Sequence, residues 1–256
     1  MRFARFRSGG KIAYGIVADG MVEEISSTPF LQYELTGDRY ALDDVRLLSP
    51  CLASKVVAIA SNYRDHAAEM GKPLPPVPNF FFKPSTAVIG PADAIFWPPG
   101  CRRLDYEGEL AVVIGAVARG VRPDRWREVV LGFTCGIDAT ARDLQEIDGQ
   151  WGRAKGFDTS APLGPWIETD ADPSDLRLVT RVNGEIKQDA STTQLVFGVP
   201  ELVAFVTSYV TLLPGDVILT GTPAGIGPLA TGDRLQVEIE GIGTLMVAVR
   251  GSPPPD

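Results

Sequence analysis

The chain has 256 residues, of which 45% are hydrophobic and 22% charged, and its formal net charge is -8 at pH 7. This composition is typical of a folded globular protein and excludes a largely disordered chain. The negative charge argues against a nucleic-acid surface, which needs clustered Lys and Arg, although a small anion can still bind where a metal ion or local cations supply a positive field.

The apolar segments do not indicate a membrane or secreted protein. The longest runs, such as VVAIA and LAVVIG, are too short to cross a bilayer, and the N-terminal MRFARFRSGGK lacks the apolar stretch of a secretory signal. Cys51, Cys101 and Cys135 are odd in number and have no metal-ligand or redox spacing, so reduced structural thiols are expected. These features predict a cytoplasmic protein.

The first 50 residues are expected to form a small β domain. The extended segments MRFARFR, KIAYGIVA and GMVEEI are joined by the turn signals SGG and DG. A buried strand, KVVAIA, follows. A short helix around His66 then ends at Gly71, before the proline-rich segment 72–78, which is expected to be a mobile loop.

Strand signals dominate the rest of the chain. They include FFFK, AIFW, GELAVVIG, VVLGFTCGI and DVILT, and two hairpins at 176–188 and 234–249, the first turning at Asn183-Gly184. One clear helix, VPELVAFVTSYVTLL, covers 199–213. The pattern predicts a mainly β (α+β) domain over 51–250 with a few helices, and a frayed tail over 251–256.

Three acidic residues are candidates for a shared site. Alternation along a strand in YEGELAVVIG would place Glu107 and Glu109 on the same side, about 7 Å apart along the chain. Asp138 follows the apolar run VVLGFTCGI, and a buried strand there would bring its carboxylate to the rim of the core. Three carboxylates without a nearby Cys or second His favour Mg²⁺ or Mn²⁺ over zinc. The alternative for an isolated Glu-x-Glu is a solvated strand end.

Two basic residues are candidates for binding an anionic substrate beside such an ion. Three carboxylates around a divalent ion leave a local charge of minus one, so further positive groups are needed. Arg142 follows Asp138 by four residues, which on a helical turn would place it on the same side. Lys155 lies in the glycine-bounded segment 151–166, which is expected to be a loop rather than a helix.

Seven segments together resemble the successive motifs of a known family. In order they are NYRDHAAE, FFKPSTAVIGP, DYEGELAVVIG, GIDATARDLQ, AKGFDTSAPLGPW, RVNGEIKQ and LTGTPAGIGP. From about residue 55 to 249 they resemble the fumarylacetoacetate hydrolase family, and the N-terminal part resembles the small β domain of its bacterial two-domain members. The resemblance implies a mixed β-roll fold, a homodimer, and Mg²⁺ or Mn²⁺ held by Glu107, Glu109 and Asp138.

His66, the only histidine, lies three residues before Glu69. This spacing brings two side chains onto one face of a helix, where a carboxylate can fix the imidazole tautomer while the ring takes a proton from water. The alternative is an exposed helical turn in which Asp65 and Glu69 only solvate the surface. The resemblance implies the first interpretation, because in smaller family members the matching pair forms a dyad on a lid helix that orders when ligand binds.

The same resemblance implies further contacts with substrate. Lys155 matches a lysine that contacts substrate, Gln145 a glutamine near it, and Thr222 a threonine whose loop holds the substrate carboxylate. In that loop Gly221 would let a backbone N–H approach an anion closely, although glycine-rich loops also serve only as turns. Together with Arg142, these residues form the expected substrate site.

The expected function is that of a Mg²⁺- or Mn²⁺-dependent enzyme acting on a small-molecule 2-oxo acid. The favoured reaction is hydrolysis of a carbon–carbon bond in an acylpyruvate-type 1,3-dicarbonyl substrate: the ion polarises the carbonyl and stabilises the departing enolate, Lys155 adds positive charge, and His66 activates water. The same chemistry serves decarboxylation of oxaloacetate and isomerisation of 2-hydroxyhepta-2,4-diene-1,7-dioate, and the sequence does not separate these. Full fumarylacetoacetate hydrolases carry a further aspartate where this chain has Ile59, which argues against fumarylacetoacetate itself.

Two alternatives come from other classes of protein. A metal-dependent small-molecule binding protein without turnover is compatible with the expected fold, but it has no need of a base such as His66. A purely structural β protein would leave three converging acids unexplained.

Overall fold

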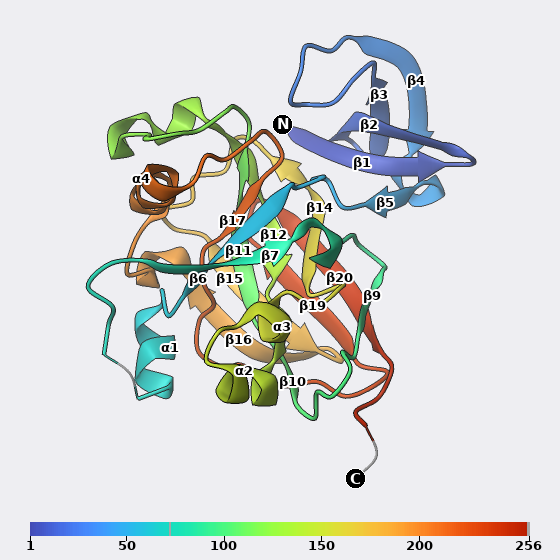
Figure 1. The fold of residues 1–256 in the computed structure, drawn as a ribbon. Helices are drawn as coiled ribbons and strands as arrows, with labels where there is room; N and C mark the ends of the chain where they lie inside the picture. Colours follow the sequence, from blue (N-terminus) through green and yellow to red (C-terminus); the bar gives the residue numbers. More distant parts are fainter. Residues whose placement is uncertain (72, 255–256) are drawn as a thin grey trace.

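A twelve-stranded sheet runs through the molecule in the computed structural model, which describes residues 1–71 and 73–254 (Figure 1). The order of its main path is β4-β3-β2-β1-β14-β12-β11-β17-β6-β7, with β5 beside β1 and β8 beside β14. The strands are β1 (Arg2–Ser8), β2 (Lys11–Ala18), β3 (Met21–Ile25), β4 (Leu35–Ala41), β5 (Arg46–Leu48), β6 (Lys55–Ala60), β7 (Asn79–Pro84), β8 (Val88–Ile89), β11 (Gly108–Ile114), β12 (Val130–Ile137), β14 (Ala161–Glu168) and β17 (Val217–Leu219).

A five-stranded sheet packs against the middle of the first sheet, with β19 and β20 against β12 and with β15 against β11. Its order is β16-β15-β19-β20-β9, and its strands are β9 (Ala94–Phe96), β15 (Arg177–Val182), β16 (Glu185–Ser191), β19 (Arg234–Ile239) and β20 (Gly243–Arg250). Leu235, Val237 and Ile239 of β19 alternate with more exposed polar residues, and they share one core with Val112 and Ile137 of the first sheet. The prediction of a mainly β roll with few helices is confirmed.

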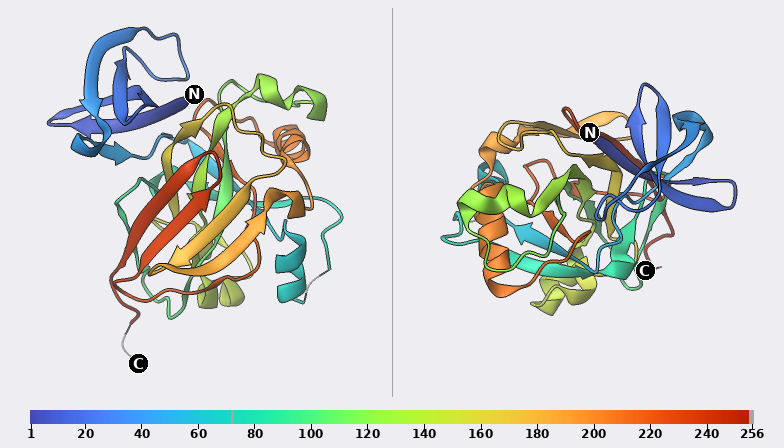
Figure 2. Two further views of the ribbon diagram at one scale, coloured as in Figure 1. Left: turned by 180° about the vertical axis from the view of Figure 1, so that it is seen from behind. Right: turned by 90° about the horizontal axis from the view of Figure 1, so that it is seen from above.

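The N-terminal strands lie to one side of this roll (Figure 2). Phe6 and Val22 belong to a small apolar cluster separate from the main core, and Tyr40 packs against it. The two parts nevertheless share backbone hydrogen bonding, because Phe3 of β1 pairs with Ile167 of β14. The division of the chain into domains at residue 50, with a further tail after residue 250, stays a prediction.

Short elements close the end of the roll opposite the N-terminal strands (Figure 1). A small sheet in the order β13-β10-β18 contains β10 (Leu104–Tyr106), β13 (Thr140–Ala141) and β18 (Gly227–Pro228).

The α-helices in the described residues are α1 (Arg64–Glu69), α2 (Arg142–Asp148), α3 (Gly152–Lys155) and α4 (Val199–Tyr209). The 3-10 helices there are η1 (Leu42–Asp44), η2 (Ser85–Ala87), η3 (Pro123–Glu128) and η4 (Thr192–Gln194).

The prediction that 151–166 is a loop was wrong. The segment contains the helical turn α3 and most of strand β14. The Lys155 N–H donates to the Trp151 carbonyl at 2.9 Å, and the Lys155 side chain is buried. Tertiary contacts therefore stabilise a turn that would be too short to form by itself.

The predicted helix over 199–213 is shorter than expected and ends at Tyr209. Leu212 instead pairs with Ala118 through two backbone hydrogen bonds of 2.9 Å. Pro214 also disfavours helical geometry at the residue before it.

The remaining expectations concern the proline-rich loop, the tail and the thiols. Lys72 and residues 255–256 lie outside the described residues, and 73–78 and 251–254 contain no helix or strand. Cys51, Cys101 and Cys135 are free and buried. Within the described ranges, none of the helices is both long enough and apolar enough to span a bilayer.

Candidate active site

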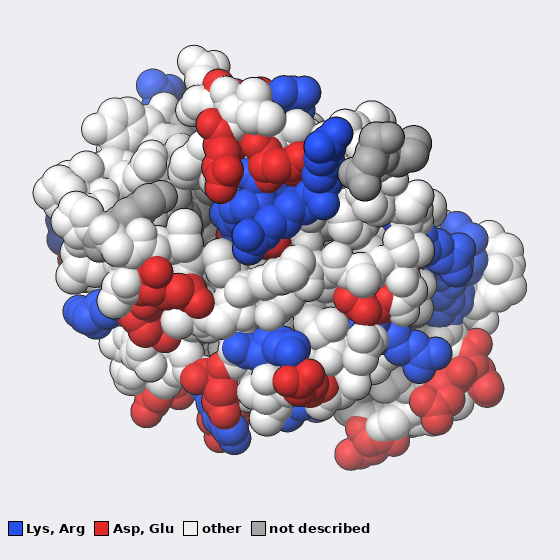
Figure 3. Space-filling view, turned by 90° about the horizontal axis from the view of Figure 1, so that it is seen from below, with Lys and Arg blue, Asp and Glu red and all other residues white. Residues whose placement is uncertain are grey.

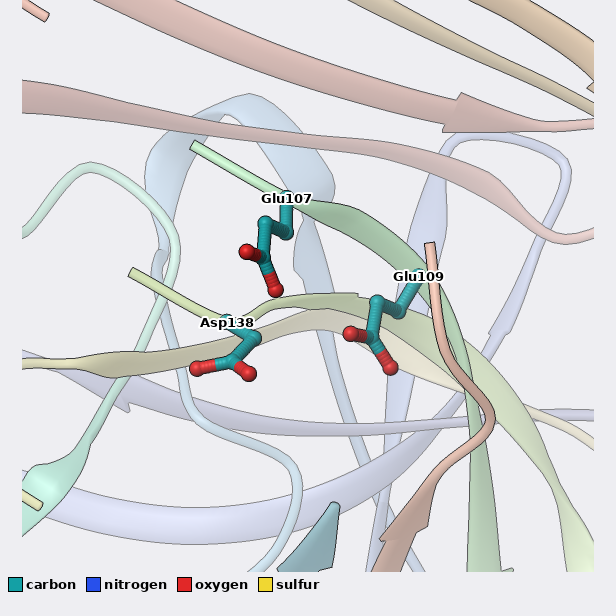
Figure 4. A group of neighbouring side chains, drawn as sticks. All are labelled: Glu107, Glu109 and Asp138. Carbon is teal, nitrogen blue, oxygen red and sulfur yellow. The ribbon is translucent and has the colours of Figure 1, made fainter. Parts of the chain in front are cut away.

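Two neighbouring strands bring the three predicted acids together. Glu107 immediately precedes β11 and Glu109 lies within it, while Asp138 directly follows β12. The antiparallel register pairs Glu109 with Gly136, and the Asp138 N–H donates to the Glu107 carbonyl at 2.9 Å. Consequently, one oxygen from each carboxylate lies within 4.8 Å of the others, and the side chains converge (Figure 4).

Buried basic side chains compensate two of these acids. Lys155 Nζ donates to Glu107 Oε2 at 2.8 Å and to Asp138 Oδ2 at 2.6 Å, and Lys83 Nζ lies 2.7 Å from Asp138 Oδ1. Arg142 Nη2 also donates to Glu107. Burial opposes ionisation of Glu107, but the charges of Lys155 and Arg142 outweigh it and hold its pKa below the usual range.

Glu109 is the exception. Its carboxylate accepts the Gly221 N–H at 2.6 Å, and it forms no ion pair with any Lys or Arg of the described residues. Burial, together with the neighbouring Asp138 and Glu107 charges, raises its pKa well above the ordinary value. The third carboxylate therefore lacks the cation that its ionised form needs.

The donor set fits a hard divalent cation. The cluster offers only carboxylate oxygens, which suit Mg²⁺ or Mn²⁺ better than a soft metal. Asp138 Oδ1 is buried and accepts no well-aligned hydrogen bond from the described residues, despite the nearby ammonium of Lys83. An ion bound here would compensate the charge of Glu109, the one acid of the cluster without a basic partner in the described residues.

His66 and Glu69 form a hydrogen-bonded pair on α1. His66 Nδ1 lies 3.0 Å from Glu69 Oε2, and since a carboxylate only accepts, Nδ1 carries a proton; in the neutral ring the lone pair is then on Nε2. His66 is 8% exposed, so the alternative of an imidazole on an exposed turn does not describe this structure. The second Glu69 oxygen accepts the Gly225 N–H at 3.0 Å, which attaches α1 to the glycine-rich loop.

His66 and the three acids line one cavity of about 60 Å³, whereas Glu69 contacts His66 from outside this lining. Its lining combines apolar side chains with the predicted polar groups, so a bound ligand would contact both kinds of surface. The lining residues are Ile59, Ala60, Ser61, His66, Met70, Phe81, Glu107, Glu109, Asp138, Arg142, Gln145, Trp151, Lys155 and Thr222.

Arg142 reaches the site by a route that differs from the predicted one. Residues 140–141 are extended in β13, so no helical turn connects Asp138 to Arg142. Arg142 is instead the first residue of α2, and its Nη1 donates to Gln145 Oε1 at 2.5 Å. Arg142 and Gln145 thus form one polar wall of the cavity.

Sequence reasoning missed Asp105, which is fully buried beneath this wall. Its carboxylate accepts Arg142 Nε at 2.9 Å and both Nε and Nη2 of Arg103 at 2.9 and 3.1 Å. The available signal was the alternation of Asp105, Glu107 and Glu109 along one strand direction. Asp105 fixes the guanidinium of Arg142 from behind.

The glycine-rich loop is already engaged by protein groups. Thr222 Oγ1 donates to the Gly108 carbonyl at 2.9 Å. The Gly221 N–H donates to Glu109, so it is not available to a substrate anion. Thr222 lines the cavity whereas Gly221 does not. A substrate contact by either residue stays a prediction.

The outer face at this end of the molecule carries mixed charge. Seen from below, where α1, α2 and the C-terminal end of the chain lie, Lys and Arg side chains are next to Asp and Glu side chains (Figure 3). Arg153, for example, donates two hydrogen bonds of 2.6 Å to Asp148 at the junction of α2 and α3. Basic side chains on this face therefore have acidic neighbours.

Comparison with known proteins identifies the family. The model of the fumarylacetoacetate (FAA) hydrolase C-terminal family matches residues 55–250, and that of the Rv2993c-like N-terminal family matches residues 1–50. This chain belongs to the fumarylacetoacetate hydrolase family. The prediction of an enzyme of this family is confirmed, so neither a binding protein without turnover nor a purely structural protein describes it.

Relatives of this fumarylacetoacetate hydrolase family member carry several activities. Protein Rv2993c of Mycobacterium tuberculosis is 46% identical and covers 99% of this chain and 100% of its own length. The mitochondrial oxaloacetate tautomerase Fahd2a of Rattus norvegicus is 42% identical over 75% of this chain and 65% of its own length. The family therefore includes an oxaloacetate tautomerase.

Solved structures add an isomerase and a hydrolase. The 5-carboxymethyl-2-hydroxymuconate delta-isomerase from Mycobacterium smegmatis has a TM-score of 0.92 and 47% identity, covering 98% of this chain and 99% of that one. The maleylpyruvate hydrolase from Sphingobium sp. SYK-6, in complex with manganese (II) ion and pyruvate, has a TM-score of 0.81 and 31% identity, covering 98% and 100%. A divalent metal is thus bound in at least one family member.

Proposed function

We propose that this enzyme acts on small 2-oxo acids at the Glu107, Glu109 and Asp138 cluster, with C–C bond hydrolysis of an acylpyruvate-type substrate as the favoured reaction. One observation carries the proposal: His66 and the three carboxylate residues line the same small cavity. A base opposite an all-oxygen cation site suits a substrate that chelates an ion through its 2-oxo and carboxylate oxygens.

The acidic cluster would hold Mg²⁺ or Mn²⁺, which as a Lewis acid would withdraw electron density from the 2-oxo group. His66 Nε2 takes a proton from water, and Glu69 stabilises the imidazolium through its hydrogen bond at Nδ1. The resulting hydroxide adds to the distal carbonyl. When the C–C bond breaks, its electron pair goes to the pyruvyl fragment, which is then protonated to pyruvate while the acyl fragment leaves as a free acid.

Proton transfer without bond cleavage is the second candidate. If His66 removes a proton from carbon rather than from water, the same site catalyses tautomerisation or isomerisation. The similar tautomerase and isomerase support this chemistry. Oxaloacetate decarboxylation is the third use of the same polarised 2-oxo group.

Product analysis separates these reactions. The protein is stripped with chelator, resupplied with Mg²⁺ or Mn²⁺, and given acetylpyruvate, oxaloacetate or 2-hydroxyhepta-2,4-diene-1,7-dioate. Hydrolysis gives pyruvate and a free acid, decarboxylation gives pyruvate and carbon dioxide, and tautomerisation breaks no C–C bond. Absence of any reaction above the buffer rate with all three would refute the proposed function.

The remaining assignments belong to the same proposal. Mg²⁺ and Mn²⁺ are equally compatible with the oxygen donors, and titration of metal-free protein with each ion compares them. We also propose a homodimer, tested by light scattering, and a cytoplasmic location, tested by fractionation of cells.

A further inference from the structure

Gln188 is a buried amide that the proposed chemistry does not use. It lies in β16, an edge strand of the five-stranded sheet, and is 1% exposed while Lys187 and Asp189 on either side are exposed. The pairing with β15 shifts here: Thr180 is opposite Gln188, but Arg181 is opposite Ile186. Lys187 is therefore the extra residue of a β-bulge, a feature that re-aims neighbouring side chains.

The amide of Gln188 connects the ligand-bearing strand to the loop that contains Thr222. Its Oε1 accepts the Gly108 N–H at 3.0 Å. Its Nε2 donates to Thr222 Oγ1 at 2.7 Å and to the Pro223 carbonyl at 2.8 Å. The orientation is fixed by the partners, because Gly108 N–H can only donate and the Pro223 carbonyl can only accept.

Gly108 is the residue between Glu107 and Glu109. Thr222 also donates to the Gly108 carbonyl at 2.9 Å, so Gln188, Thr222 and Gly108 form a closed triangle of hydrogen bonds. Both amide hydrogens of Gln188 are used, and a shift of the loop against the strand would break at least one bond in a buried place.

The bulge also supports the part of the loop that contacts α1. A Cβ at Gly225, which has a φ of 98°, would come within 2.0 Å of the Lys187 carbonyl, so the loop lies directly on the bulged residue. Gly225 N–H is the donor to Glu69 Oε1, and Tyr106 Oη donates to the Gly225 carbonyl at 2.8 Å. The position of this loop relative to β16 therefore determines where Glu69 is held, and Glu69 in turn orients His66.

We propose that Gln188 is a positioning residue that keeps the 222–225 loop in register with the Glu107–Glu109 strand and so couples the substrate site to the His66–Glu69 pair. It acts through Thr222 and Gly225 and does not line the cavity. The effect of Gln188 on keto-acid binding rests on the proposed function, whereas its effect on the position of the His66–Glu69 pair does not.

The test compares Gln188→Met, which keeps length but removes all three hydrogen bonds, with Thr192→Val. Thr192 is the matched control: it follows the same strand, is 3% exposed, and its hydroxyl accepts the Leu176 N–H at 2.9 Å. Mg²⁺ affinity, oxalate binding to the Mg²⁺-loaded protein and melting temperature are measured for both. A fourth readout is the imidazole ¹⁵N spectrum of untagged protein, which reports one histidine only.

In Gln188→Met we expect oxalate to bind at least about 10-fold more weakly, which corresponds to the loss of roughly one buried hydrogen bond. Mg²⁺ affinity should change by less than about 3-fold, because Gly221 and the lysines still hold the acids. The ¹⁵N signals should change from one Nδ1-protonated tautomer to a mixture. In Thr192→Val the melting temperature falls but the ¹⁵N spectrum and oxalate affinity stay unchanged.

Unchanged oxalate binding and an unchanged ¹⁵N spectrum in Gln188→Met would overturn the proposal, whatever the melting temperature. If that variant does not fold, Gln188→Glu replaces it, since a carboxylate still accepts from Gly108 but cannot donate to Thr222 and Pro223; wild-type behaviour there also overturns it. If wild-type protein binds neither Mg²⁺ nor oxalate, the proposed function fails, and the ¹⁵N comparison still decides whether Gln188 positions the His66–Glu69 pair.

Discussion

The acidic cluster and helix α1 face each other across one cavity, but they are built very differently. Glu107, Glu109 and Asp138 come from adjacent central strands and are nearly fully buried. Basic side chains hold Glu107 and Asp138, and the Gly221 N–H holds Glu109. Helix α1 has six residues, no side-chain N-cap, and an exposed C-terminal turn. It is attached by Asn62, whose Nδ2 donates to the Thr220 carbonyl at 2.8 Å, and by the contact of Glu69 with Gly225.

This difference separates two tasks. A cation site needs fixed oxygens in a fixed field, which a central sheet provides. A base that must let substrate enter is better placed on an element with few buried contacts, because such elements open at low free-energy cost. Variants on the two sides should therefore fail in different ways.

The largest effect is expected from Glu109→Gln on the rigid side. This residue forms no ion pair with the described basic residues, and its raised pKa already favours the neutral form, so the amide should be tolerated by the metal-free fold. Losing one of three ligands should weaken Mg²⁺ binding by more than about 100-fold, because mutating a residue that only hydrogen-bonds to a metal ligand already costs about 10- to 100-fold in affinity. Calorimetry measures the affinity, and thermal melting without metal measures the fold.

Glu107→Gln is the matched control. It also removes a ligand, but it leaves Lys155 and Arg142 with one acidic partner fewer, so metal-free stability should fall by about 1–3 kcal/mol. Equal metal-free melting temperatures of the two variants would contradict this assignment of charges.

The next effect in size comes from the α1 side. His66→Gln should leave Mg²⁺ affinity unchanged and lower kcat by about 10²–10⁴-fold, the usual contribution of a general base. Glu69→Gln should have a smaller effect, because the imidazole remains but its tautomer is no longer fixed. A His66→Gln variant with full turnover would assign the proton transfer to another group.

The same contrast explains how much could be predicted from the sequence. The acids were predictable because strand alternation and an apolar run place them at the ends of buried strands, and the His66–Glu69 spacing indicated one helix face. The contribution of Gln188 could not be predicted, because a β-bulge turns its side chain inward. Asp105 continues the alternation of Glu107 and Glu109, but its ion pair with Arg142 depends on the pairing of β10 with β13. Lys155 was predicted in the site, but its helical turn depends on burial rather than on local sequence.

A more moderate effect is expected from Asp105→Asn, which weakens the support behind Arg142 without touching the cavity. Asp105 is fully buried between two guanidinium groups. Loss of its charge should raise KM for a keto acid by about 10-fold, equivalent to a single buried hydrogen bond to a charged group, with a smaller change in kcat. Steady-state kinetics measure this split, and Arg153→Gln, on the exposed outer face, is the control.

The smallest effect on activity is expected at Asp216, which supports the rigid side and does not line the cavity. Its fully buried carboxylate accepts Ser54 N–H at 2.9 Å, Leu213 N–H at 2.8 Å and Lys55 Nζ at 2.5 Å. Burial opposes its ionisation, but hydrogen bonds from Lys55, Leu213 and Ser54 outweigh this and lower its pKa from 3.8. A pKa that is lower in the folded state gives stability that is present above pH 3.8 and is lost as the pH falls through the folded value. Asp216→Asn should therefore lower the free energy of unfolding by about 1–3 kcal/mol at pH 7 and by less at pH 3, with kcat unchanged. Urea unfolding at the two pH values measures the difference, and an equal loss at both would mean that the charge of Asp216 does not stabilise the sheet.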